Sequence, residues 1–283
     1  MIENIFFGKT VLPGESIRII LAFLGVLIAT YFDIFNRRNV PDKFLYAFLV
    51  VAFIANLAFY DADLFLFSLA MAIFFSAIFY VFYRMGQLGG ADVIVMASVM
   101  LLLPIHPSFV KISFNFPFLF STLVFSGTVF ALYVIIYYGA KLFSKGANPK
   151  WGYALMLIPY ALFVYIYFTS QVLFSPVYLV LITVLFVATT FFLMFKDDLN
   201  TLLSEQVPLS RLETEDVLAL DIMDQKIVKK YQLKRLVNDG EIKRLTTAGL
   251  KEVIVYSKLP PFMPFFLVGM IIAMLYASAL LFL

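Results

Sequence analysis

Cysteine is absent from the 283-residue sequence, and histidine occurs only once. Without cysteine, the chain cannot use thiol catalysis, a disulfide scaffold or a cysteine-based zinc site, and one histidine excludes a metal site built from several histidines. We therefore expect no metal and no cofactor. Charge is also scarce, because only 14% of the residues are Asp, Glu, Lys or Arg, against roughly a quarter in a typical soluble domain.

Hydrophobic residues make up 63% of the chain, which excludes a water-soluble globular domain and indicates that most of it lies in a lipid bilayer. The formal net charge of +3 is too small to indicate a nucleic-acid partner. No basic segment with a small-residue cleavage site opens the sequence, so we expect no cleaved signal peptide.

The apolar residues are grouped in segments of membrane-spanning length. A helix needs roughly 17 to 25 mostly apolar residues to cross the hydrocarbon core. Because Pro104 and Pro107 end the fourth segment early, we expect that segment to be tilted or shielded by its neighbours. We predict an all-α polytopic membrane protein with about eight transmembrane helices, at 17–36, 43–60, 64–84, 91–105, 117–141, 151–169, 175–195 and 261–282.

One segment differs in composition from the rest. Residues 196–259 contain eleven basic and eleven acidic side chains. Apolar residues recur at helical spacing from Leu212 to Leu236, and residues 253–256 are typical of a short strand. We therefore predict three parts: a catalytic transmembrane domain (1–195), a small mixed α/β cytosolic insertion (196–260) and a last transmembrane helix (261–283).

The distribution of Lys and Arg predicts the orientation. Alternate connections between the spans are basic, and the longest of them is the polar segment, whereas the opposite side has only Lys9, Arg18 and Lys111. By the positive-inside rule the basic side is cytoplasmic. We expect a multi-pass plasma membrane protein with both termini outside.

Two acidic residues stand out, because an ionisable group at mid-membrane costs roughly 2.5–3.5 kcal/mol. Asp33 lies within the last turns of the first span. Asp92 begins the fourth span, where a carboxylate alone is equally well explained as a helix cap. Helix ends and a short loop explain the other three acidic residues between positions 17 and 195, which are Asp42, Asp61 and Asp63.

The predicted topology brings Asp33 and Asp92 together at the cytoplasmic face, because one ends an inward-running helix and the other begins an outward-running helix. Such a pair is what an aspartic protease requires, since one carboxyl stays protonated while the other activates water. Glycines before Asp92 permit close approach of the backbone. We predict Asp33 and Asp92 as the catalytic residues.

Three motifs resemble those of the prepilin and preflagellin peptidases of the type IV prepilin peptidase family, which are GxGD aspartic membrane proteases. The first is Asp33 followed by Asn36-Arg37-Arg38-Asn39-Val40-Pro41. The second is Gly89-Gly90-Ala91-Asp92, with Ala where many bacterial members have Gly. The third is Leu259-Pro260-Pro261-Phe262-Met263-Pro264-Phe265 with Gly269.

The resemblance implies an endopeptidase that removes the short basic leader from type IV pilin-like or archaellin precursors at the cytoplasmic face. It implies no N-methylation, because the cysteines of the bacterial zinc-binding insert are lacking. The position of the polar segment resembles that in archaeal members. We expect Gly89, Gly90 and Ala91 to shape the site. The resemblance also leaves open a role in binding the substrate or in orienting the site for three further residues, Arg37, Arg38 and Pro41.

Other interpretations remain. For Arg37 and Arg38 we favour membrane anchoring over a role at the site. The acidic residues of the polar segment either meet a basic leader or form a solvated helix face, and we favour the solvated face; they are Glu213, Glu215, Asp216, Asp221 and Asp224.

Three alternative functions remain for the protein. They are a protease of the presenilin or signal-peptide-peptidase type, a proton-coupled transporter that uses the same two aspartates, and an assembly scaffold. The sequence does not indicate an oligomeric state.

Overall fold

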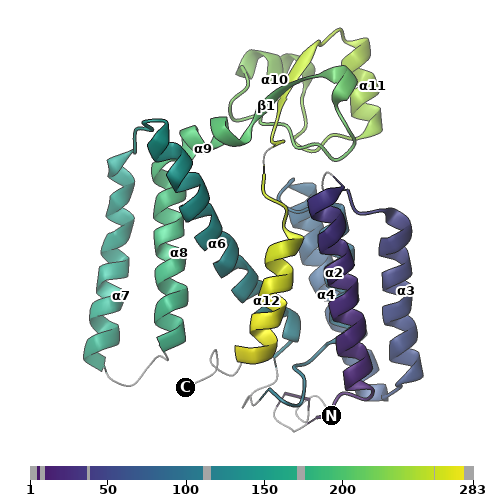
Figure 1. Ribbon diagram of the computed structural model, residues 1–283. Helices are drawn as coiled ribbons and strands as arrows, with labels where there is room; N and C mark the ends of the chain where they lie inside the picture. The colour runs from purple at the N-terminus through teal and green to yellow at the C-terminus, as the bar shows by residue number, and fades with distance from the viewer. Residues whose placement is uncertain are drawn as a thin grey trace.

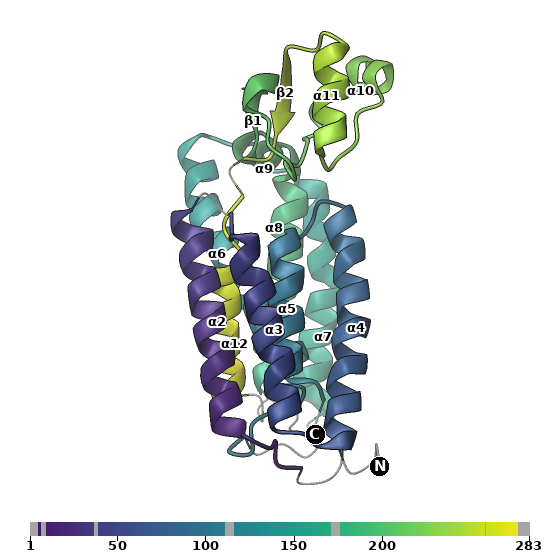
Figure 2. The ribbon, with the colours of Figure 1, turned by 90° about the vertical axis from the view of Figure 1, so that its right-hand side faces the viewer.

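A computed structural model of the chain describes residues 5–6, 10–36, 39–110, 116–170, 176–257 and 259–276. Most of them are helical, and the long helices stand side by side in a bundle, with a small module of short elements at one end (Figures 1 and 2). Each expected span coincides with a helix. These helices are α2 (Glu15–Phe35), α3 (Asp42–Ala58), α4 (Ala62–Arg84), α5 (Gly90–Leu102), α6 (Phe118–Ser144), α7 (Leu157–Ser170), α8 (Pro176–Met194) and α12 (Met263–Tyr276), and a 3-10 turn, η1 (Trp151–Met156), leads into α7.

Among the described residues, five helical segments are long and apolar enough to cross a membrane: Glu15–Phe35, Ala62–Arg84, Phe118–Ser144, Trp151–Thr169 and Pro176–Met194. This fits a multi-pass membrane protein. Helices α3, α5 and α12 are shorter, with 17, 13 and 14 residues, and a span needs about 20. The expected count of eight spans therefore stays a prediction, and the end of the last expected span lies outside the described residues.

The short helix α5 lies in the core of the bundle. It packs against α2, α3 and α4, and Val95, Met96, Val99 and Met100 have no exposed surface. The two prolines that follow it end the helix, as predicted. Neighbouring helices shield α5 on several sides, so a helix too short to cross the bilayer can occupy this position.

Helix α12 stands between α6 and α2 (Figure 1). Its contact with α6 is close because Gly269 has no side chain. A Cβ atom at Gly269 would lie 2.0 Å from Ser126 Oγ, 2.5 Å from Ser126 N and 2.7 Å from Thr122 O. Small residues at such a crossing let two apolar helices approach closely. The packing of α12 on both neighbours fixes where its first residue, Met263, lies.

The polar segment begins with α9 (Lys196–Leu203) and continues into a compact unit that we call the 205–255 module. The module contains a two-stranded antiparallel sheet, in which Glu205 faces Val255 and Val207 faces Val253. Its own apolar core includes Leu218, Val237 and Leu245. Its elements are β1 (Glu205–Pro208), η2 (Leu209–Arg211), α10 (Gln225–Tyr231), α11 (Asp239–Thr247) and β2 (Glu252–Val255).

The helical spacing from Leu212 to Leu236 wrongly predicted a helix over most of that segment. Only α10 is helical there. Asp224 starts α10 by accepting a hydrogen bond from the Lys226 amide, and Gln232 ends it in a left-handed conformation. Before α10, Val217 and Leu218 form isolated bridges to Leu236 and Val255 instead. Over a short segment, apolar residues that cover a small sheet can thus have the same spacing as the apolar residues of a helix.

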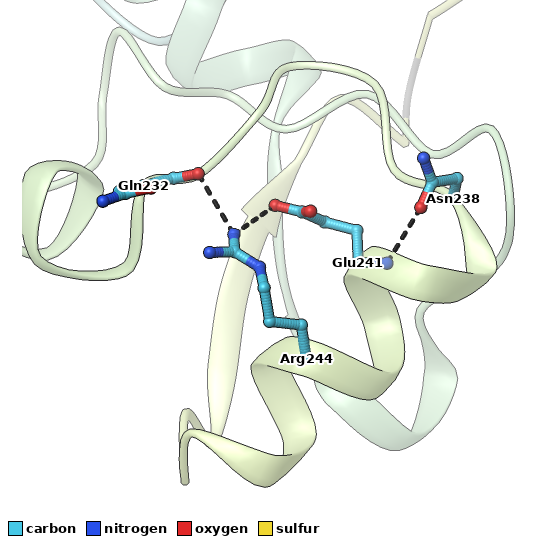
Figure 3. A network of polar contacts seen from close by, with 4 residues as sticks. All are labelled: Gln232, Asn238, Glu241 and Arg244. Atoms are coloured by element: carbon cyan, nitrogen blue, oxygen red, sulfur yellow. Dashed lines mark hydrogen bonds and ion pairs between the residues drawn. The ribbon is translucent and has the colours of Figure 1, made fainter.

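Helix α11 is fixed to the rest of the module by polar contacts (Figure 3). Asn238 caps it by accepting a hydrogen bond from the Glu241 amide at 2.8 Å. Arg244 pairs with the buried carboxylate of Glu241 and donates to the carbonyl oxygen of Gln232 at 3.1 Å. These contacts connect α11 to the end of α10.

Candidate active site

Asp33 is placed by the last turn of α2 and is buried, with 7% of its surface exposed. Its Oδ2 accepts a hydrogen bond from the backbone amide of Met263, the first residue of α12, at 2.9 Å. One turn earlier on α2, Thr30 Oγ1 donates to the Met263 carbonyl oxygen at 3.2 Å. The first amides of a helix lack partners within the helix and carry partial positive charge, so a carboxylate there is stabilised.

Asp92 lies in the first turn of α5 and is partly exposed. Its Oδ2 accepts a hydrogen bond from the Gly89 amide at 3.1 Å, which gives it the capping role considered from the sequence. The loop before it needs glycine at Gly86, where φ is +69°. A Cβ atom at Gly89 would lie 3.3 Å from Asp92 Oδ2. The loop and the carboxylate are therefore closely fitted.

The structure brings the two aspartates together. Helices α2 and α5 pack against each other, and Asp33 lies close enough to Asp92 for their charges to interact. The last turn of α2, with Asp33, lies at the end of the bundle that faces the 205–255 module (Figure 2), and Asp92, in the first turn of α5, interacts electrostatically with Glu215 of that module. The arrangement holds two carboxylates near each other, one buried and one partly exposed.

A third carboxylate belongs to the same region. Glu215 of the 205–255 module also interacts electrostatically with Asp92. Its Oε1 accepts a hydrogen bond from Tyr83 Oη, near the end of α4, at 2.9 Å. A Cβ atom at Gly90 would lie 3.0 Å from the same Oε1. Glu215 is therefore not on the solvated helix face that the sequence favoured, but in a turn that touches the glycine loop.

The other predicted residues are placed in different ways. Gly90 begins α5, and Ala91, beside it, packs against the apolar core of the bundle. Pro41 directly precedes α3. Arg37 and Arg38 lie outside the described residues. Among the described residues, no group of three or more His, Asp or Glu side chains is placed to hold a metal ion.

Two contacts of the site were not predicted. The proline-rich third motif marked the start of α12 but gave no sign that the Met263 amide would reach Asp33. Pro264 follows within the first turn, where a missing amide is tolerated. The pairing of Tyr83 with Glu215 joins residues 132 positions apart, and neither residue belongs to a motif.

Comparison with known proteins gives one positive finding. Neither the curated proteins nor the solved structures include a significant match. Residues 20–143 match the sequence model of the type IV leader peptidase family. The matched segment covers less than half of the chain but contains Asp33, Asp92 and the glycine loop. Over residues 20–143 the chain is thus similar to the type IV leader peptidase family, in agreement with the resemblance of its motifs.

Proposed function

We propose that this leader peptidase-like protease is of the aspartic type and uses Asp33 and Asp92 to cleave the leader from type IV pilin-like or archaellin precursors. The observation that carries the proposal is the meeting of these two carboxylates, 59 positions apart in the sequence, with charges that interact. Both lie in the segment that matches the family.

The proposed chemistry needs one proton shared by the pair. The ionised carboxylate takes a proton from water as the water oxygen attacks the peptide carbonyl carbon, and the protonated carboxyl donates a hydrogen bond to the developing oxyanion. Collapse of the tetrahedral intermediate then breaks the C–N bond, and the amine leaves with the proton that the carboxylate had taken from water, so the pair again shares one proton. Because the two groups titrate as a pair, neither is assigned as the acid.

Backbone donors hold both carboxylates in place. The Met263 amide binds Asp33 Oδ2 and the Gly89 amide binds Asp92 Oδ2. In each case one oxygen of the carboxylate is oriented by the fold. Such preorganisation reduces the reorganisation needed during the reaction.

The proposed location is the cytoplasmic face of the plasma membrane. The basic connections of the sequence support this orientation through the positive-inside rule. A leader followed directly by a hydrophobic helix would place its cleavage point at the membrane surface, at the depth of Asp92. The lack of cysteine supports cleavage without N-methylation.

The test is cleavage of a panel of prepilin and archaellin precursors by the full chain in liposomes, with mass spectrometry of the products. We expect cleavage at the boundary between leader and helix, and loss of cleavage in Asp33→Asn and Asp92→Asn. Asp42→Asn is the matched control, because Asp42 is an exposed aspartate in the first turn of α3.

The outcomes separate the alternatives. Substantial residual cleavage in either aspartate variant would contradict the two-carboxylate chemistry. Cleavage deep within the apolar helix of the substrate would favour a presenilin-type protease. Ion-driven uptake without any peptidase activity would favour the transporter.

A further inference from the structure

The 205–255 module contacts the loop that precedes Asp92 at two points. A Cβ atom at Gly86 would lie 3.1 Å from Val217 Cγ1, and this glycine has a positive φ that other residues rarely adopt. At the other end of the loop, Gly90 faces the carboxylate of Glu215. The glycines of the loop therefore accommodate the module as well as Asp92.

Glu215 has a fixed position within the module. Its φ is +74°, which is uncommon for a residue other than glycine. The Glu215 amide donates to the carbonyl oxygen of Val237 at 2.9 Å, and the Val237 amide donates back to Asp216 O at 3.0 Å. Asp216 Oδ2 also accepts a hydrogen bond from the Glu213 amide at 2.8 Å. These bonds hold a turn that presents Glu215 toward Tyr83.

The charges around Glu215 indicate what it would bind. Its side chain is exposed, and no ion pair between described residues includes it. Asp33 and Asp92 add negative charge at the same place. Because Glu215 lies close enough to Asp92 for their charges to interact, a substrate held with its cleaved bond at the two aspartates would lie near this carboxylate. The complementary group at that point is a cation.

We propose that Glu215 determines specificity by binding a Lys or Arg side chain of the substrate close to the cleaved bond. The proposal rests on the proposed function of Asp33 and Asp92. Tyr83 orients the carboxylate through its hydroxyl group, and the 205–255 module supplies the turn. Glu215 itself takes no part in the bond-breaking step.

The experiment measures kcat/KM for precursors in which each basic leader position carries Lys, Gln or Glu in turn, with the full chain in liposomes. We expect the natural chain to prefer Lys over Gln at one position by about tenfold, the size of one charge-assisted hydrogen bond. Glu215→Gln should reduce this ratio to near one, mainly through KM, and Glu215→Arg should favour Glu at that position. Tyr83→Phe should weaken the preference.

Glu213→Gln is the matched control, since Glu213 is an exposed neighbour in the same turn and should leave the ratio unchanged. The ratio does not depend on the fraction of folded enzyme, so a partly unfolded variant still gives an answer. If Glu215→Gln and Glu215→Arg cleave with the natural preference, the proposal is wrong while the aspartic peptidase stands. If the natural chain cleaves no precursor, the proposed function fails and this proposal fails with it.

Discussion

Asp33 Oδ2 and the backbone amide of Met263 form a hydrogen bond of 2.9 Å across 230 positions of the sequence. This bond joins the family-matched segment to α12, which lies beyond it. The last helix is therefore part of the support of the site, and its start must be placed accurately for Asp33 to keep its orientation.

The contribution of this amide can be removed without removing the helix. Met263→Pro deletes the N–H donor at the first helical position, where proline is well tolerated. We expect cleavage to fall by about tenfold or more, since one oriented hydrogen bond to a charged group is lost. Met263→Leu retains the amide and is the control. Equal activities of the two variants, measured at equal helicity by circular dichroism, would contradict the role of the amide.

The close crossing of α12 and α6 predicts a second effect. Gly269→Ala places a methyl group against backbone atoms of α6, which cannot move away as a flexible side chain could. We expect destabilisation of roughly 1–3 kcal/mol, measured by thermal unfolding in detergent, with a loss of cleavage. Gly127→Ala on α6 is the control, because nothing lies within 4 Å of its added Cβ atom. Equal melting temperatures of the two variants would argue against this crossing.

The contact between Gly90 and Glu215 predicts coupling between two variants. In Gly90→Ala the new methyl group lies 3.0 Å from Glu215 Oε1, so the carboxylate must shift by a few tenths of an ångström. We expect Gly90→Ala to reduce the preference for a cationic leader residue in the natural chain. In a Glu215→Gln background the same change should have little further effect, because residues in contact are not additive. Simple addition of the two effects, seen in the kcat/KM ratios, would contradict the contact.

A buried arginine at the other end of the bundle predicts a purely structural effect. Arg18 is 2% exposed and donates to Asn56 Oδ1 at 2.9 Å and to the carbonyl oxygens of Leu101 and Leu102, both at 3.4 Å. It thereby binds the carboxyl end of α5. Arg18→Met should destabilise the protein by roughly 2–3 kcal/mol, because these acceptors lose a charged donor. Calorimetry in detergent measures this, with the exposed Arg84→Met as the control; equal stability of the two variants would be the contrary result.

The sequence predicted the helical segments well because long apolar runs, ended by prolines such as Pro104, leave few alternatives in lipid. It also predicted a strand at 253–256, which the structure has at Glu252–Val255, and placed Asp33 and Asp92 at one end of the bundle. It did not predict β1, whose four residues pair with β2 only through contacts far along the chain. A similar reason applies to Glu215, because its turn with positive φ is held in part by hydrogen bonds to Val237, which is distant in the sequence.

The rate of precursor cleavage by Asp33→Asn, Asp92→Asn and the double variant tests most directly whether the two carboxylates work as one unit. Groups that act together in one step are strongly non-additive. We expect each single variant to lose about a thousandfold or more, as is usual for loss of acid–base catalysis, and the double variant to be no slower. A single variant that keeps substantial activity, or losses that multiply in the double variant, would contradict a shared site.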